Sequence, residues 1–196
     1  MEIEHIAIIG AGQMGNGIAQ VSSCAGYRVT MIDIKEEFLD KGMNTINNSL
    51  NKLVSKGKMS EIEAESAISR ISTSTDKSSA SNADLVVEAI PEVLSYKTSL
   101  FAELDSLCKP EAILATNTSS ISIDSIASST NRPDRVIGMH FMNPVPIMKL
   151  VEIINGSNTS DEVNNAVVNA AEKMGKTALS CNCLLYTSDA ADDDRS

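Results

Sequence analysis

The 196-residue sequence has no tryptophan and few aromatic residues, which make up 3% of the chain. Basic residues are also scarce: 16 Lys and Arg stand against 26 Asp and Glu, so the net charge is −10. This excess of acid argues against nucleic acid or an anionic membrane surface as the main partner. An anionic small molecule remains compatible with the composition, provided that backbone N–H groups or a few local basic residues bind it.

The sequence also lacks long apolar runs and a Cys-x-x-Cys motif, and we expect no signal peptide. No stretch approaches the roughly 18 apolar residues of a membrane-spanning helix, and the N-terminus carries acid where a signal peptide carries base. The four cysteines form no Cys-x-x-Cys pair and match no zinc-site spacing. Two of them lie inside or beside helical patterns, where a buried free thiol is expected. These features predict a cytoplasmic protein with no membrane segment and no metal site.

Short apolar runs alternate with stretches of helical period from residue 5 to about residue 182. The runs are typical of parallel strands buried on both faces. They cover residues 5–10, 28–33, 84–90, 112–116, 136–141 and 150–154, and a further strand is expected after Gly175. Helical spacing follows Val93 and the capping-box pattern Thr159-x-x-Glu162. The alternation predicts an α/β fold with a doubly wound, mostly parallel sheet. A Ser-rich stretch at 72–81 is interpreted as a surface loop, because the alternation resumes beyond it.

The last 14 residues depart from this pattern. Residues 183–196 have no period and end in an acidic cluster, and the run 184–193 resembles the translation of an adaptor used in sequencing libraries. We therefore predict one domain over residues 1–182, followed by a non-native tail at 183–196. A natural disordered tail is the alternative.

A glycine-rich turn follows the first expected strand and opens a helix: Gly10-Ala11-Gly12-Gln13-Met14-Gly15. In such a turn the first glycine permits the sharp bend, the second lets the backbone approach a pyrophosphate, and the third lets the helix pack on the strand. The N–H groups that start the helix bind the phosphates. Asp33 ends the next strand, 18 residues past Gly15, where a carboxylate binds a ribose diol and repels a 2′-phosphate. The sequence thus predicts a Rossmann-type domain with NAD as cofactor; a glycine turn beside a surface Asp is the alternative.

Polar residues stand at the carboxyl ends of the expected strands, where open α/β sheets bind ligands. His140 ends such a strand, whereas His5, the other histidine, begins the first strand and belongs to the opposite edge. Oxidation of an alcohol with NAD needs a base near neutral pH, which histidine provides. Glu152 in the next strand could orient the imidazole and stabilise its protonated form. Simpler alternatives are a structural His140, a solvated Glu152, Ser119 as a helix N-cap and Lys97 as an exposed helix residue.

Four motifs follow the glycine turn in order: 87–92 (VEAIPE), 117–120 (NTSS), 140–146 (HFMNPVP) and 148–152 (MKLVE). With them, residues 1–182 resemble the N-terminal domain of NAD-dependent L-3-hydroxyacyl-CoA dehydrogenases, most closely the short bacterial 3-hydroxybutyryl-CoA type. The resemblance implies oxidation of (S)-3-hydroxyacyl-CoA by NAD to 3-oxoacyl-CoA and NADH. It also implies a small-molecule acyl-CoA as the partner.

The resemblance further implies a role for particular residues. His140 is the general base, Glu152 is its partner, and Ser119 bonds the substrate oxygen and touches the cofactor. The residues that it places on the nicotinamide half of the NAD site are Glu92, Lys97 and Asn143. Those that it places on coenzyme A are Ser49 and Lys56, on the long helix after the second strand, together with Ser119. Lys52 and Lys58 are close enough in sequence to serve in place of Lys56.

The sequence departs from the family near residue 182. In the family, a segment like 174–177 (MGKT) continues into a helical second domain that closes the acyl pocket and forms the homodimer. At the position expected for an active-site Asn of that continuation, this chain has Ala190. We therefore expect a truncated, inactive fragment of such a dehydrogenase. Two alternatives stay open: an NAD-binding module without turnover, and an L-gulonate-type sugar-acid dehydrogenase related to the same family.

Overall fold

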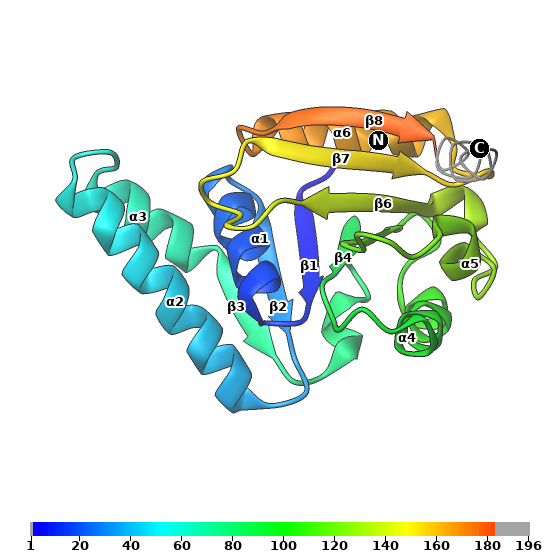
Figure 1. Cartoon of the computed structure of the whole chain (residues 1–196). Coiled ribbons are helices and arrows are strands. Elements are labelled where there is room, and N and C mark those ends of the chain that lie inside the picture. Colours follow the sequence, from blue (N-terminus) through cyan, green and yellow to red (C-terminus); the bar gives the residue numbers. More distant parts are fainter. Residues whose placement is uncertain (1, 183–196) are drawn as a thin grey trace, which may run out of the picture.

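The computed structural model describes residues 2–182 and shows one eight-stranded sheet with helices on both sides (Figure 1). The strand order is β3-β2-β1-β4-β5-β6-β7-β8. Neighbouring strands run parallel except β6 and β7, which are antiparallel. The predicted doubly wound, mostly parallel sheet is therefore confirmed. The tail predicted at 183–196 lies outside the described residues.

The strands and helices alternate along the chain as the apolar runs predict. The strands are β1 (His5–Ile9), β2 (Arg28–Ile32), β3 (Ile71–Ser74), β4 (Leu85–Glu88), β5 (Ile113–Thr116), β6 (Val136–Phe141), β7 (Leu150–Asn155) and β8 (Thr177–Asn182). The α-helices are α1 (Gln13–Cys24), α2 (Glu36–Ser55), α3 (Glu61–Ser69), α4 (Leu94–Leu107), α5 (Ile123–Ala127) and α6 (Asp161–Lys173). Two short 3₁₀ helices are η1 (Lys77–Ala80) and η2 (Pro133–Arg135).

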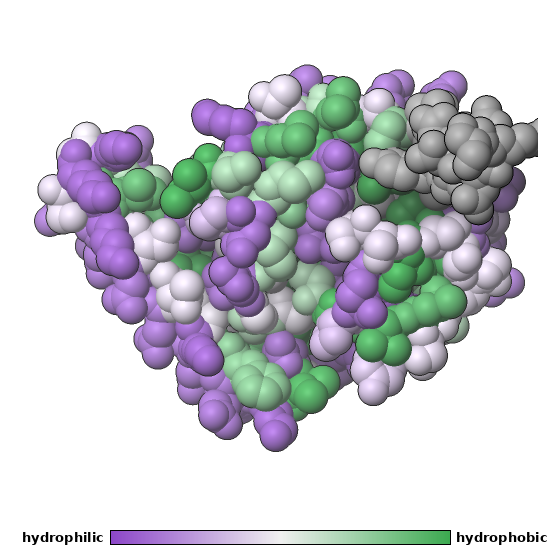
Figure 2. Space-filling view, in the orientation of Figure 1, coloured by the Kyte–Doolittle hydropathy of each residue, from purple (hydrophilic) through white to green (hydrophobic). Residues whose placement is uncertain are grey.

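The sheet is buried on both faces, which explains why its strands are continuous apolar runs. Successive side chains of β1 alternate between two hydrophobic clusters. Ile6 and Ile8 belong to the cluster formed with α1, α2, α3 and α6, whereas Ala7 and Ile9 belong to the cluster formed with α4 and α5. The outer surface of α2 and α3 is mainly hydrophilic (Figure 2).

Three local predictions are wrong. Residues 71–74, next to and partly within the stretch interpreted as a loop, form the edge strand β3, whose backbone pairs with β2 although its side chains are half-exposed or exposed. The cap of α6 is Ser160, one residue beyond Thr159, because the Thr159 hydroxyl donates instead to the Val136 carbonyl. Cys108 is a buried thiol, but Cys24 is exposed at the end of α1.

None of the helices between residues 2 and 182 combines the length and apolar character that crossing a bilayer requires. Within the same range, no group of three His, Cys, Asp or Glu side chains could hold a metal ion.

Candidate active site

The glycine turn between β1 and α1 is built so that only glycine fits at two positions. Gly10 has φ +105°, and a Cβ there would lie 2.8 Å from the Ala89 carbonyl oxygen. A Cβ on Gly15 would lie 1.7 Å from the Gly10 carbonyl oxygen, so this residue lets α1 pack against the turn. The Cβ position of Gly12, by contrast, has no atom within 4 Å. No side chain caps the start of α1, so the N–H groups of its first turn are available beside this open space.

Asp33 lies directly beside the glycine turn. One carboxylate oxygen, Oδ2, accepts a hydrogen bond from the Ala11 N–H at 2.6 Å, and Oδ1 accepts one from the Ile34 N–H at 2.7 Å. Each oxygen keeps a further lone pair for a ligand. The open backbone, the free helix N–H groups and this carboxylate fit a dinucleotide with a free ribose diol.

His140 and Glu152 form a pair across β6 and β7. The two residues are direct partners in the antiparallel register, and His140 Nδ1 lies 2.8 Å from Glu152 Oε2. Both side chains are partly exposed, at 19% and 29%. His140 Nε2 has no hydrogen-bond partner among residues 2–182, so it is free to meet a ligand.

His5 lies at the opposite edge of the sheet, because it begins β1, whereas His140 stands near the end of the strand β6 that runs in the same direction. Its Nε2 is 2.8 Å from the Thr30 hydroxyl. Burial, reinforced by the charge of Arg28, lowers the pKa of His5. His5 is therefore a structural residue of the core.

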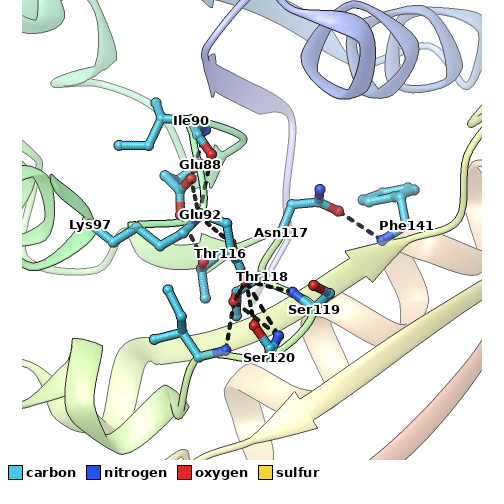
Figure 3. A network of polar contacts seen from close by, with 11 residues as sticks. Glu88, Ile90, Glu92, Lys97, Thr116, Asn117, Thr118, Ser119, Ser120 and Phe141 are labelled. Carbon is cyan, nitrogen blue, oxygen red and sulfur yellow. Dashed lines mark hydrogen bonds and ion pairs between the residues drawn. The ribbon is translucent and has the colours of Figure 1, made fainter. Parts of the chain in front are cut away.

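Lys97 is almost fully buried, at 1% exposed, so the alternative of an exposed helix residue is wrong. Its ammonium lies 2.6 Å from Glu88 Oε1, 3.2 Å from Glu92 Oε2 and 3.5 Å from the Ile90 carbonyl oxygen (Figure 3). Glu88 is itself 0% exposed and also accepts a hydrogen bond from the Thr116 hydroxyl at 2.7 Å. One buried ammonium thus joins the end of β4, the start of α4 and the loop between them.

Glu92 extends this network of ion pairs and hydrogen bonds to the loop after β5. Its Oε1 accepts hydrogen bonds from the Thr118 hydroxyl, the Ser119 N–H at 3.1 Å and the Ser120 N–H at 3.3 Å (Figure 3). Burial would raise the pKa of the Glu92 carboxyl, but the Thr118 hydrogen bond and the Lys97 charge outweigh burial and lower it. Glu92 is therefore an ionised anchor for residues 118–120.

Ser119 is held by its backbone, and its hydroxyl has no partner within the described part of the chain. The alternative that Ser119 caps a helix is wrong, because the N-cap of α5 is Ser122. Asn117 Oδ1 accepts a hydrogen bond from the Phe141 N–H at 2.8 Å, which fixes this loop beside the end of β6 (Figure 3). The free Ser119 hydroxyl is thus carried by a loop that is tied to the strand of His140.

The loop after β6 is also joined to the glycine turn. Gln13 Nε2 donates to Asn143 Oδ1 at 3.2 Å, so the first residue of α1 contacts the segment that follows His140. The residues predicted for the cofactor and for the chemistry are therefore brought to one edge of the sheet.

A cleft of about 640 Å³ opens where α1, α2 and the turn after α6 meet the loop between β6 and β7. Ser49 and Lys56 both line it, although Lys56 is the C-cap residue that follows α2 rather than a residue within the helix. The cleft gathers basic side chains in an otherwise acidic chain: Lys52, Lys56, Lys58 and Lys173. Its composition suits an anionic ligand.

In a comparison with known protein families, residues 5–183 match the family described as the NAD-binding domain of 3-hydroxyacyl-CoA dehydrogenase. The chain belongs to this family. The resemblance stated from the four motifs is thereby confirmed, and so is NAD as the expected cofactor.

Individual members of the 3-hydroxyacyl-CoA dehydrogenase family agree with this assignment. A probable 3-hydroxybutyryl-CoA dehydrogenase from Bacillus subtilis is 52% identical over 182 residues, which are 93% of this chain and 63% of the relative. A probable 3-hydroxybutyryl-CoA dehydrogenase from Deinococcus radiodurans is 53% identical over 175 residues, 89% of this chain and 63% of the relative. The crystal structure of (S)-3-hydroxybutyryl-CoA dehydrogenase from Ralstonia eutropha superposes with a TM-score of 0.91 at 41% identity, covering 92% of this chain and 64% of that one. The chain thus spans less than two thirds of these relatives.

Sequence reasoning did not identify the buried network that joins β4, α4 and the loop after β5. Glu88 is its centre, and the signal was present: it is a carboxylate in the otherwise apolar strand β4, whose residues are all buried. Thr116 gave a similar signal at the end of β5. Polar residues that end buried strands need partners nearby, and here they supply partners to each other.

Proposed function

We propose that this chain supplies the NAD site and the catalytic pair of a dehydrogenase that oxidises (S)-3-hydroxyacyl-CoA, with 3-hydroxybutyryl-CoA as substrate. The observation that carries the proposal is the His140–Glu152 pair, whose Nδ1 and Oε2 are 2.8 Å apart, at the sheet edge that also holds the glycine turn. The names of the two bacterial relatives support the substrate.

The cofactor is held by backbone and carboxylate groups. In this proposal the N–H groups of Gln13 and Met14 bind the pyrophosphate, Gly12 leaves room for it, and Asp33 accepts the hydroxyls of the adenosine ribose. The residues assigned to the nicotinamide half are Glu92, Lys97 and Asn143. NAD bound here would supply the hydride acceptor, so the residues of this chain would have only the proton to transfer.

His140 is the general base of the proposed reaction. Its free Nε2 takes the proton of the substrate hydroxyl, because Nδ1 is engaged with Glu152. The Glu152 carboxylate stabilises the imidazolium that results and fixes the ring in one orientation. The unpartnered hydroxyl of Ser119 donates to the substrate oxygen and so fixes the alcohol carbon at the cofactor.

The lysine-lined cleft is the proposed site for coenzyme A. Ser49 and Lys56 lie in its wall with three further lysines, which match the phosphates of a CoA thioester better than a small sugar acid. We further propose that the whole protein is a cytoplasmic homodimer with no nucleic-acid partner. For the 196 residues alone we propose binding of NADH without turnover, since they span 63% of the bacterial relatives.

The experiment measures both ligands on the purified 196-residue chain. We expect NADH to bind, as judged by its fluorescence, and acetoacetyl-CoA to bind, as judged by calorimetry. Lys56→Met should weaken the binding of acetoacetyl-CoA. The matched variant Lys41→Met changes an exposed residue of α2 outside the cleft and should leave that binding unchanged. Absence of NADH binding would overturn the cofactor site, and equal acetoacetyl-CoA binding by the two variants would overturn the cleft assignment. L-gulonate in place of acetoacetyl-CoA tests the sugar-acid alternative.

A further inference from the structure

Lys176, between α6 and β8, is a buried lysine whose partners are backbone carbonyls. It is 8% exposed, and its Nζ donates to the Val145 carbonyl at 2.5 Å and to the Met148 carbonyl at 2.8 Å. No carboxylate within residues 2–182 pairs with it. Burial lowers the pKa of the Lys176 ammonium, and the nearby charge of Lys149 lowers it further. Burial of an ammonium without an ion-pair partner costs free energy, and this cost indicates that Lys176 has a specific role.

The two carbonyls belong to the loop 142–149, which joins β6 to β7 and lies against α1 (Figure 1). Within the loop, the N–H groups of Ile147 and Met148 both donate to the Pro144 carbonyl, at 3.0 and 2.9 Å, and form a tight turn. Val145 is 2% exposed and packs on Gly17 of α1, where a Cβ would lie 2.8 Å from the Val145 Cβ. Lys176 bonds to two carbonyls of the same turn, those of Val145 and Met148.

The loop serves both proposed ligand sites. At its start, Asn143 accepts a hydrogen bond from Gln13 of the glycine turn. Further along, Pro146 and Ile147 line the lysine-rich cleft together with Ser49. A change in the loop therefore reaches the nicotinamide side through Asn143 and the cleft through the Pro146–Ile147 wall.

We propose that Lys176 is a positioning residue for ligand binding: by bonding two carbonyls of the 142–149 loop, it holds Asn143 toward the nicotinamide half of the NAD site. The inference rests on the proposed function, because it takes Asn143 as a cofactor contact. Loss of the ammonium leaves the buried Val145 carbonyl and the partly buried Met148 carbonyl without this donor, and the loop must shift for water to reach the Val145 carbonyl. Asn143 then moves with it.

The first test replaces Lys176 by Met, which keeps the length of the aliphatic stem but cannot donate. We expect NADH to bind the 196-residue chain about tenfold more weakly, which corresponds to about 1.4 kcal/mol. Lys176→Arg, which can still reach carbonyls with several donors, should recover most of the affinity. The matched control is Lys149→Met, which removes the same charge from an exposed position on the loop itself and should change the affinity less than twofold.

The second test separates positioning from a general loss of stability. Asn143→Ala, Lys176→Met and the double variant are compared for NADH affinity. If Lys176 acts through Asn143, the NADH affinity of the double variant should lie within about twofold of that of the single variant that binds NADH less tightly. If the fold-losses of NADH affinity in the two single variants multiply in the double variant, the two residues act independently and the proposal is overturned.

The outcomes are distinct from those for the proposed function. An unmutated chain that does not bind NADH defeats the proposed function itself. An unmutated chain that binds, with a Lys176→Met variant that binds equally well, defeats this inference alone. Should Lys176→Met fail to fold by circular dichroism, the same cycle is run with Lys176→Gln, whose shorter amide keeps a polar group there but cannot bridge both carbonyls. The same affinity results then decide the proposal.

Discussion

Replacement of Lys97 by Met should destabilise the protein far more than the loss of an ordinary lysine does. Lys97 is 1% exposed and its main partner, Glu88, is 0% exposed, so the substitution leaves a carboxylate buried without its counter-ion. The Thr116 hydroxyl and the Ile90 N–H, at 2.7 Å each, still bond to that carboxylate but carry no full charge. Breaking a buried pair in this way costs about 3–5 kcal/mol.

A second substitution at Glu88 tests whether the cost arises from the unpaired charge. In the variant Glu88→Gln/Lys97→Met, a neutral amide replaces the carboxylate and can still bond to Ile90 N–H and Thr116. The double variant should therefore be more stable than Lys97→Met alone, by about 2 kcal/mol or more, although it carries one more substitution. If the two substitutions instead destabilised the protein independently, the double variant would be less stable than Lys97→Met.

The assay is urea unfolding followed by circular dichroism at pH 7.5, with all variants analysed for a common slope. The matched control is Lys77→Met, which breaks the ion pair with Glu103, where the side chains are 41% and 43% exposed. An exposed pair of this kind contributes about 0.2–1 kcal/mol. The reasoning fails if Lys97→Met costs no more than Lys77→Met.

Three further predictions concern the cofactor, the base and acid stability. Asp33→Ala should narrow the preference for NADH over NADPH, measured as the ratio of dissociation constants; equal binding of both by the unmutated chain would refute the role of Asp33. In a chimera that joins residues 1–182 to the remaining length of a relative, His140→Ala should lower turnover about 10²–10⁴-fold with NADH affinity unchanged, and a near-normal rate would place the base elsewhere. Because burial lowers the pKa of His5 in the folded state, the unfolded chain binds its proton first. Stability is therefore complete above the unfolded pKa of about 6.5 and falls as the pH drops toward the folded value. Urea unfolding at pH 7.5 and 5.5 should show a smaller loss for His5→Gln, and an equal loss would assign the acid sensitivity to other groups.

The strands could be predicted because burial on both faces leaves them apolar throughout. The edge strand β3 could not, since its residues 71–74 are half-exposed or exposed and do not form an apolar run, so the strand depends mainly on its pairing with β2. The cap of α6 was misplaced by one residue for a related reason. Thr159 and Ser160 both suit a cap, and the choice depends on the Val136 carbonyl, which the Thr159 hydroxyl reaches from 23 positions away.

The candidate site could be predicted where local chemistry and topology coincide. His140 and Glu152 stand in successive strands, and their pairing needs only the antiparallel register that the structure shows. The burial of Lys97 is different. It precedes Leu100 and Phe101 by three and four residues, which places it on the apolar face of α4, but a helical pattern alone does not reveal a buried carboxylate on a neighbouring strand. The burial of Lys97 could therefore be predicted only together with that of Glu88, its partner on β4.

The acidic composition of the chain is no obstacle to the anionic ligands proposed for it. Fields from exposed charges are screened over about 8 Å at physiological ionic strength, so a phosphate responds to the groups in contact with it rather than to the net charge of −10. At the glycine turn those groups are the uncapped N–H groups of α1. In the cleft they are Lys52, Lys56, Lys58 and Lys173. Asp33 is the acidic group at the glycine turn, and there it is assigned to the ribose hydroxyls rather than to the phosphates. Contacts with these local groups, rather than the net charge, therefore determine where an anionic ligand binds.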